Sequence, residues 1–283
     1  MSAGSLALTS PRRRNLAVVS NLLLLVIALL FVLPIVWIVL GAFDATTNLS
    51  VKIPDPFTLQ NFQDVLTPDQ AWIPLLNSVI LSGGCAVVTV AVAVLAAYPL
   101  SRYRMRINKP FLYGVLFGTC LPITAMMVPV YSLFVLFNGL NSFVAIIFFL
   151  AATSLPMAIW MMKNFMDGVP IVLEEAAWVD GASMLQTLWR VVVPLMRPGI
   201  GVVFIFVFIQ AWGNFFVPYI LITNQEQMPA AVTIYNFFGA YGTVAYGQLA
   251  AFSLVYSLPV LGLYALVQRF SGGSFALAGA VKG

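Results

Sequence analysis

The chain has few charged residues and almost none of the residues that build metal sites or disulfides. Only 8% of its 283 residues are Asp, Glu, Lys or Arg, and 61% are hydrophobic. About a quarter of the residues in a soluble domain are charged, so the composition excludes an ordinary soluble domain and predicts an integral membrane protein. Histidine is absent, and both cysteines, Cys85 and Cys120, lie in apolar runs. We therefore expect neither a disulfide framework nor a metal site.

Signatures of nucleotide binding and of hydrolysis are also missing. No Gly-x-x-x-x-Gly-Lys-Ser/Thr motif occurs, so the chain itself is not expected to bind ATP, and no cofactor is expected in it. Neither His-Glu-x-x-His nor Gly-x-Ser-x-Gly occurs. An intramembrane hydrolase therefore has no support from the sequence.

Six apolar runs are long enough to cross a membrane, which takes roughly 20 residues for about 30 Å of hydrocarbon. They cover residues 16–40, 77–100, 111–137, 143–162, 200–222 and 247–268. The sequence thus predicts an all-α polytopic membrane protein, with six transmembrane helices in a single domain over residues 1–283. No run contains a charged residue between its ends, which argues against proton- or sodium-coupled transport through carboxylates.

Lysine and arginine are distributed unevenly along the chain. Twelve of the 13 fall in the N-terminal segment, in alternate connections between the spans or near the C-terminus, and only Lys52 falls on the other side. The positive-inside rule then predicts a plasma-membrane protein with both termini in the cytoplasm. Because the basic residues adjoin apolar runs, the net charge of +4 does not indicate a nucleic-acid partner. Residues 163–199 become a long cytoplasmic connection.

This cytoplasmic connection contains two helix signals around a glycine. Residues 174–180 are good helix formers with acidic residues first, where the helix dipole favours negative charge. Gly181 suits a left-handed C-cap, and Ser183 with Gln186 forms a capping-box signature for a second short helix. Pro194 and Pro198 are expected to end that helix. Small residues near the bend would let a partner protein approach, although an amphipathic loop lying on lipid headgroups fits equally well.

The spacing in this connection resembles the coupling loop of bacterial ABC-importer permeases. Glu-Ala-Ala at residues 175–177 is followed by three residues and Gly181, and nine residues later by Val191-Val192-Val193-Pro194. The resemblance is to the maltose-type, carbohydrate-uptake branch and covers nearly the whole chain. It extends to Ala211-Trp212-Gly213-Asn214-Phe215, to the C-terminal Gly279-Ala280-Val281-Lys282-Gly283, and to Pro156, Ala158, Trp160, Lys163 and Phe165.

The resemblance implies an ABC-importer permease fold and a non-enzymatic transport subunit for a carbohydrate. The implied partners are two ATP-binding subunits, which would bind ATP and Mg, a second homologous permease and an extracytoplasmic sugar-binding protein. It also implies that the connection docks on the ATPase through Glu174, Glu175, Ala176, Ala177, Asp180, Gly181, Ala182, Ser183 and Pro194.

A polar stripe is predicted in the fifth span. Gln210 and Asn214 are four residues apart, so on a helix they share one face. An amide that faced lipid would lose its hydrogen bonds, so both should face the interior. They are candidates for a sugar path with Trp212 and Tyr219, whereas hydrogen bonding between helices would explain the two amides without a substrate.

Three other functions stay open from the residues alone. A permease for oligopeptides or amino acids is the main alternative substrate class. A secondary transporter or channel, and a membrane-embedded enzyme, are the other two. Neither the identity of the sugar nor the subunit that contacts it follows from the sequence.

Overall fold

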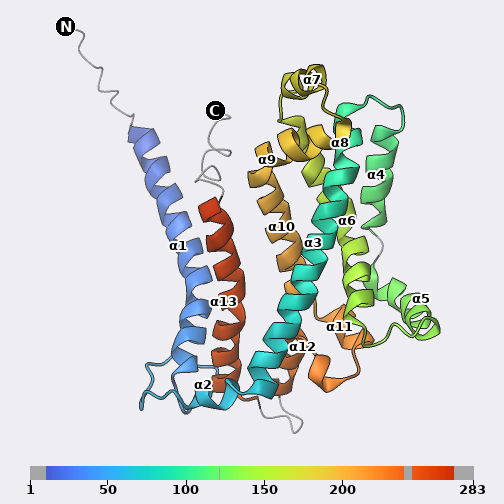
Figure 1. Ribbon diagram of the computed structural model, residues 1–283. Helices are drawn as coiled ribbons and strands as arrows, with labels where there is room; N and C mark the ends of the chain where they lie inside the picture. The colour runs from blue at the N-terminus through green and yellow to red at the C-terminus, as the bar shows by residue number, and fades with distance from the viewer. Residues whose placement is uncertain (1–10, 121, 239–243, 271–283) are drawn as a thin grey trace. The chain divides into compact units, whose positions relative to one another are not determined.

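The computed structural model describes residues 11–120, 122–238 and 244–270 (Figure 1). Within these ranges the chain is helical, with an isolated β-bridge between Asp44 and Phe57. The predicted all-α class is confirmed. The C-terminal motif at residues 279–283 lies outside the described residues. The described residues form two compact units: the first unit (residues 11–65 and 244–254) and the second unit (residues 66–120, 122–238 and 255–270).

The first unit is built from α1 (Pro11–Ala42), α2 (Gln60–Val65) and the first turns of α13 (Tyr246–Phe270). Its small buried core consists of Ala42, Ala250 and Ala251. By contrast, residues 18–36 of α1 are exposed throughout. An apolar helix with no buried side chain over this length suits a lipid environment, as expected of a first span.

Asp44 organises the loop that follows α1. Its carboxylate accepts a hydrogen bond from the Thr46 backbone N–H (2.9 Å) and forms an ion pair with Lys52 (2.9 Å). The Thr46 hydrogen bond, followed by the Lys52 ammonium, lowers the pKa of Asp44 below its ordinary value. The loop is therefore held by a carboxylate that stays ionised.

The second unit centres on α3 (Ile73–Arg102), α6 (Phe143–Asp167) and α10 (Arg197–Trp212). A π-helical turn, η1 (Pro68–Trp72), leads directly into α3, which packs against both α6 and α10. Small side chains make this close approach possible. A Cβ atom added at Gly84 would lie 2.6 Å from Ile147, and the alanines Ala86, Ala93, Ala97 and Ala158 are fully buried.

The third predicted span is broken rather than continuous. It consists of α4 (Asn108–Gly118) and α5 (Ile123–Leu136), which are bent by 87° relative to each other. Pro122 precedes α5 with an extended backbone (ψ 125°). Proline has no N–H to donate to an incoming helix, so α5 starts anew after it instead of continuing α4.

The fifth predicted span, residues 200–222, is also interrupted. α10 ends at Trp212, and α11 (Phe216–Leu221) begins after a short break. Pro218 lies in the first turn of α11, where its missing N–H removes no hydrogen bond, whereas a continuous helix would require that donor. Asn214 marks the break, and its side-chain Oδ1 accepts a hydrogen bond from the Val217 backbone N–H (3.1 Å).

Short helices follow: η3 (Gln225–Gln227), α12 (Ala230–Thr233) and η4 (Ile234–Phe238). Two polar side chains of α3 hold this segment. Asn77 Nδ2 donates to the Glu226 carbonyl (2.9 Å), and Ser78 Oγ accepts from the Ala230 backbone N–H (2.9 Å). Sequence-distant loops are thereby tied to the start of α3.

Four described segments are continuous, apolar and long enough to span a membrane: residues 18–42, 68–102, 143–167 and 246–269. Two bent pairs bring the number to six if each pair is one span, namely residues 108–118 with 123–136 and residues 184–195 with 197–212. The six predicted runs thus correspond to four continuous helices and two bent pairs, with different bounds for the fifth.

Candidate functional site

The connection at residues 163–199, which was predicted to be cytoplasmic, contains two helical pieces around a left-handed glycine. α7 (Val172–Val179) carries Glu174 and Glu175 in its first turn. Gly181 follows with φ +86°, and the Ala182 backbone N–H donates to the Ala177 carbonyl (2.9 Å). This bond satisfies one of the orphan carbonyls at the end of α7. The predicted left-handed bend at Gly181 is confirmed.

The second piece begins with the predicted capping box. Ser183 Oγ accepts from the Gln186 backbone N–H (3.4 Å), while Gln186 Oε1 accepts from the Ser183 backbone N–H (2.9 Å). α8 (Met184–Thr187) continues through a π-helical turn, η2 (Leu188–Val192), into α9 (Val193–Leu195). The capping box is confirmed by both bonds.

The helical run of α8, η2 and α9 ends at Leu195, between Pro194 and Pro198, as predicted. Pro194 lies in the first turn of α9, and the helical run continues to Leu195. A proline ring clashes with the carbonyl four residues earlier in an α-helix, and the wider π-helical turn η2 ends at Val192, two residues before Pro194. Pro198 likewise starts a helix, since it lies in the first turn of α10.

The predicted docking residues differ in their accessibility. Glu175, Ala176, Asp180, Gly181 and Ser183 are exposed, and Ala177, Ala182 and Pro194 are partly exposed. Glu174 is 0% exposed, so its side chain is not available to a partner protein. It faces the interior of the second unit instead.

Sequence reasoning missed the apolar character of the exposed loop surface. Val179 is 88% exposed, and other large hydrophobic side chains of the connection are exposed as well. We call seven of them the apolar docking face, after the docking role predicted for this connection: Val172, Leu173, Trp178, Val179, Met184, Leu185 and Trp189. Apolar side chains gathered on one surface segment are typical of protein interaction sites or membrane contacts. The hydrophobic residues on both sides of Gly181 in the sequence were the signal from which this exposed apolar surface could have been predicted.

Glu174 belongs to a buried polar cluster that the sequence pattern did not reveal. Its Oε1 lies 2.6 Å from Arg102 Nε, and its Oε2 accepts a hydrogen bond from Tyr98 OH (2.9 Å). Tyr98 and Arg102 lie on the last turns of α3, more than 70 residues earlier. Their distance in sequence explains why no local motif predicted the contact.

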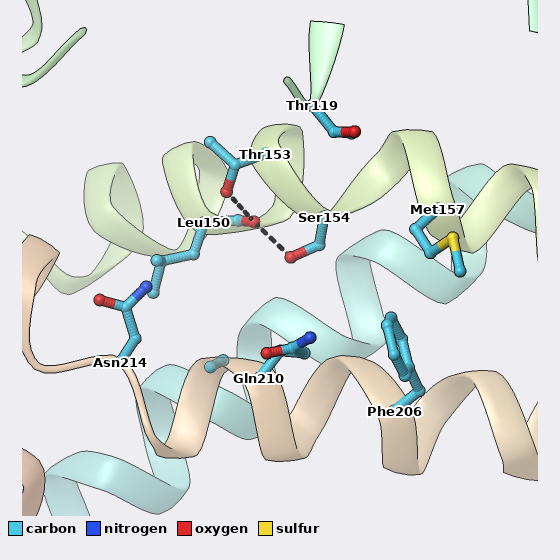
Figure 2. A pocket seen from close by; sticks show the side chains of 9 residues that line it. Thr119, Leu150, Thr153, Ser154, Met157, Phe206, Gln210 and Asn214 are labelled. Carbon is cyan, nitrogen blue, oxygen red and sulfur yellow. Dashed lines mark hydrogen bonds between the residues drawn. The ribbon is translucent and has the colours of Figure 1, made fainter. Parts of the chain in front are cut away.

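A cavity of about 320 Å³, lined by both polar and apolar side chains, lies in the second unit and contains two of the four predicted path residues. Gln210 projects from α10 towards α6, beside Phe206, while Ser154 and Met157 project from α6 (Figure 2). The complete lining is Thr119, Leu150, Thr153, Ser154, Met157, Phe206, Gln210, Ala211 and Asn214. None of these nine residues is charged.

Gln210 lies in the last turns of α10, whereas Asn214 lies in the break between α10 and α11, and both side chains line the cavity. The prediction that one helix face carries both is wrong, because α10 ends between them. Asn214 Oδ1 is used to cap α11, whereas no hydrogen bond links Gln210's side chain to another described residue. The hydroxyls of Thr153 and Ser154 both donate to the Leu150 carbonyl (2.9 Å each; Figure 2).

Trp212 and Tyr219 do not line the cavity. Trp212 is only 3% exposed and packs between Phe208 (ring centroids 5.5 Å apart) and Tyr256 (5.2 Å). Tyr256 OH also donates to the Trp212 carbonyl (2.6 Å) at the end of α10. Tyr219 is exposed and stacks on Phe215 (5.0 Å). In this structure Trp212 therefore acts in packing.

Comparison with known families matches residues 89–271 to the family described as binding-protein-dependent transport system inner membrane component. The chain belongs to this family. The match contains the connection at residues 163–199, called the docking connection below after its predicted role, and every residue that lines the cavity. The recognition made from the coupling-loop pattern is confirmed.

Individual relatives support the same assignment. The chain is 31% identical over 251 residues to an inner membrane ABC transporter permease protein of Escherichia coli, covering 86% of this chain and 87% of the relative. It is 29% identical over 269 residues to a diacetylchitobiose uptake system permease protein of Streptomyces coelicolor, covering 93% and 96%. These relatives are transport permeases, as the family description leads one to expect.

The fold matches that of a solved transporter. A crystal structure of a bacterial ABC transporter involved in import of the acidic polysaccharide alginate includes a chain that aligns with a TM-score of 0.79 at 23% identity, covering 93% of this chain and 98% of that one. The predicted ABC-importer permease fold is confirmed.

Proposed function

We propose that this chain is the membrane-spanning permease subunit of an ATP-driven importer for a neutral carbohydrate. It works with two ATP-binding subunits, a second homologous permease and an extracytoplasmic sugar-binding protein. Both termini and the connection at residues 163–199 face the cytoplasm, and ATP and Mg bind to the partner ATPase. The observation that carries the proposal is the apolar docking face around a left-handed glycine in a chain of this family.

The docking face has the properties of a surface that another protein covers. Apolar side chains exposed to the cytoplasm would be costly to leave in water. Glu175 and Asp180 border them, and Ala176 is small enough for close approach. Gly181 sets the angle between α7 and α8. An ATPase that changes shape on binding ATP would therefore contact the apolar docking face in one defined geometry and could move it.

The uncharged polar side chains that line the cavity support a neutral, hydroxyl-rich substrate. Gln210 and Asn214 offer amide donors, and Thr119, Thr153 and Ser154 offer hydroxyls. These groups match the donors and acceptors of a sugar, and no lining residue carries a charge that would form an ion pair with a carboxylate or ammonium group. The diacetylchitobiose relative favours the same substrate class.

Reconstitution tests the proposal. The purified complex in liposomes, with its binding protein, should hydrolyse ATP faster when the binding protein carries a neutral saccharide, and should move that saccharide inwards. A binding protein that retains peptides or amino acids and ignores saccharides would overturn the carbohydrate assignment. Saccharide flux that persists without the ATPase would overturn the ATP-driven mechanism.

A further inference from the structure

Glu174 lies in the docking connection, yet it is fully buried and both of its carboxylate oxygens are engaged. Arg102, its ion-pair partner, has a side chain that is 7% exposed. A buried charge is tolerated only when it is paired and hydrogen-bonded. This cluster meets that condition, and it joins α7 to the end of α3.

We propose that Tyr98, Arg102 and Glu174 form a latch through which α3 follows the docking connection when the ATPase moves it. Glu174 is then a positioning residue that transmits movement rather than a contact for the ATPase. The inference rests on the proposed function, since it assigns the route by which ATPase movement reaches the membrane helices.

The guanidinium of Arg102 holds the connection at two places. Its Nε lies 2.6 Å from Glu174 Oε1 within α7, and its Nη2 donates to the Val169 carbonyl (3.1 Å) just before α7. A lysine could not reproduce this, because an ammonium is a single point charge and lacks the planar fork of donors. Tyr98 OH occupies the second carboxylate oxygen. Three bonds therefore fix both the position and the rotation of α7 against α3.

The same guanidinium is linked to α6. Arg102 Nη1 donates to Ser101 Oγ (3.1 Å), and Ser101 Oγ donates to Asp167 Oδ1 (2.6 Å). Asp167, the last residue of α6, is paired with Lys163 one turn earlier. The hydrogen-bonded chain thus runs from α7 through α3 to α6, and it ends where α6 turns into the docking connection.

Chain connectivity shows why such a latch matters. The docking connection continues α6 and leads into α10, so movement of α7 reaches these two helices through the backbone. α3 has no backbone link to the connection and can follow only through side-chain contacts. The cluster supplies an ion pair and hydrogen bonds between α3 and the connection. Tyr103 adds a weaker contact to Met184 Sδ (3.6 Å). Because α3 packs against both α6 and α10, which line the cavity, the latch would let α3 move with these two helices.

The test compares coupling in variants of the reconstituted complex. Arg102→Gln and Glu174→Gln each leave a partner unpaired, and Arg102→Lys keeps the charge but not the fork. We expect saccharide moved per ATP hydrolysed to fall about tenfold or more, within the range typical of coupling between sites, which is roughly 5- to 150-fold. ATPase co-purification should stay at the wild-type level, since the docking face is unchanged.

Arg104→Gln is the matched control, because Arg104 lies two residues away, is exposed and takes no part in the cluster. Arg104→Gln should leave the amount of saccharide moved per ATP hydrolysed unchanged. If a glutamine variant fails to assemble, Tyr98→Phe decides, since it removes one hydrogen bond and keeps the ion pair. A wild-type ratio in assembled Tyr98→Phe and Arg102→Lys complexes would overturn the latch. A wild-type complex that moves no saccharide with ATP would instead overturn the proposed function.

Discussion

Replacing Gly181 separates the backbone requirement of the docking bend from the effect of added bulk. Gly181 has φ +86°, and a Cβ atom added there meets no other atom within 4 Å. Within the chain, the penalty of a side chain at this position is therefore conformational. Asparagine visits the left-handed region more readily than other L-residues, whereas valine is β-branched and resists it. Gly181→Asn and Gly181→Val thus form a pair of similar size and different backbone preference.

The expected magnitudes follow from the backbone. A β-branched residue held in the left-handed region costs about 1–3 kcal/mol. If the connection escapes that cost by leaving the bent conformation, the docking-competent population falls roughly 5- to 150-fold. Asparagine should lose much less. The bend lies outside every predicted span, so both variants should reach the membrane normally.

Saccharide uptake by cells and pull-down of the ATPase measure the two variants side by side. We expect uptake and ATPase association to follow the order glycine, asparagine, valine, with valine clearly the weakest. Equal loss in the asparagine and valine variants would mean that bulk at the partner surface matters and the left-handed backbone does not. Normal uptake by Gly181→Val would remove the bend from the mechanism.

Four further predictions concern topology, docking, the cavity and acid stability. In a background without the native cysteines, a cysteine replacing Asp64 should react with a membrane-impermeant thiol reagent in intact cells and one replacing Ser183 should not; the opposite result would reverse the topology. Ala177→Asp should weaken ATPase association in pull-downs, because it adds an unpaired charge at the docking face; full association would place Ala177 outside the contact. Gln210→Leu should lower saccharide transport about fivefold, the loss expected from one hydrogen bond of roughly 1 kcal/mol, with ATPase assembly intact; unchanged transport would exclude Gln210 from the path. Asp44 has a pKa below its ordinary 3.8 in the folded chain, so its stabilising contribution is present above pH 3.8 and is lost as the pH falls through the lowered pKa. The thermal stability of Asp44→Asn should therefore trail the wild type at pH 7, and the difference should shrink in strong acid; a pH-independent difference would refute this origin.

Local signals in the sequence predicted local structure well. Gly181, Ser183 and Gln186 each act through backbone groups a few residues away, so their pattern identified the bend and the capping box. The apolar runs at residues 143–162 and 247–268 likewise correspond to continuous helices, although each contains one proline, Pro156 and Pro259 respectively.

Prolines could not be interpreted from the sequence alone, since the same residue can end a helix or start one. The helix ends between Pro194 and Pro198, as expected, yet each proline also lies in the first turn of a helical segment. Pro218 lies in a new helix, and the break before it separates Asn214 from Gln210. Hydropathy did not detect this break, because residues on both sides are apolar.

The roles of Glu174 and Trp212 depend on partners distant in sequence. Glu174 shares the local pattern of its exposed neighbour Glu175, and only the approach of α3 makes it a buried partner of Arg102. Trp212 adjoins the cavity residue Ala211, yet packing against Tyr256 of α13 holds its ring elsewhere. One-dimensional patterns cannot supply such contacts.

The pairing of Arg102 with Glu174 has a consequence for how the chain is made. The two residues are 72 positions apart, and a ribosome adds roughly 5–20 residues per second, so Arg102 exists for about 4–14 s before its carboxylate is synthesised. During that interval it is an unpaired cation next to a new span, which is the kind of charge that retains a loop in the cytoplasm. Under the proposed topology, Arg102 first helps to orient α3 during insertion. After Glu174 has been synthesised, it pairs with Arg102 and the charge becomes buried. Under this topology Arg102 would thus act first in orienting the helix and later in holding the folded chain together.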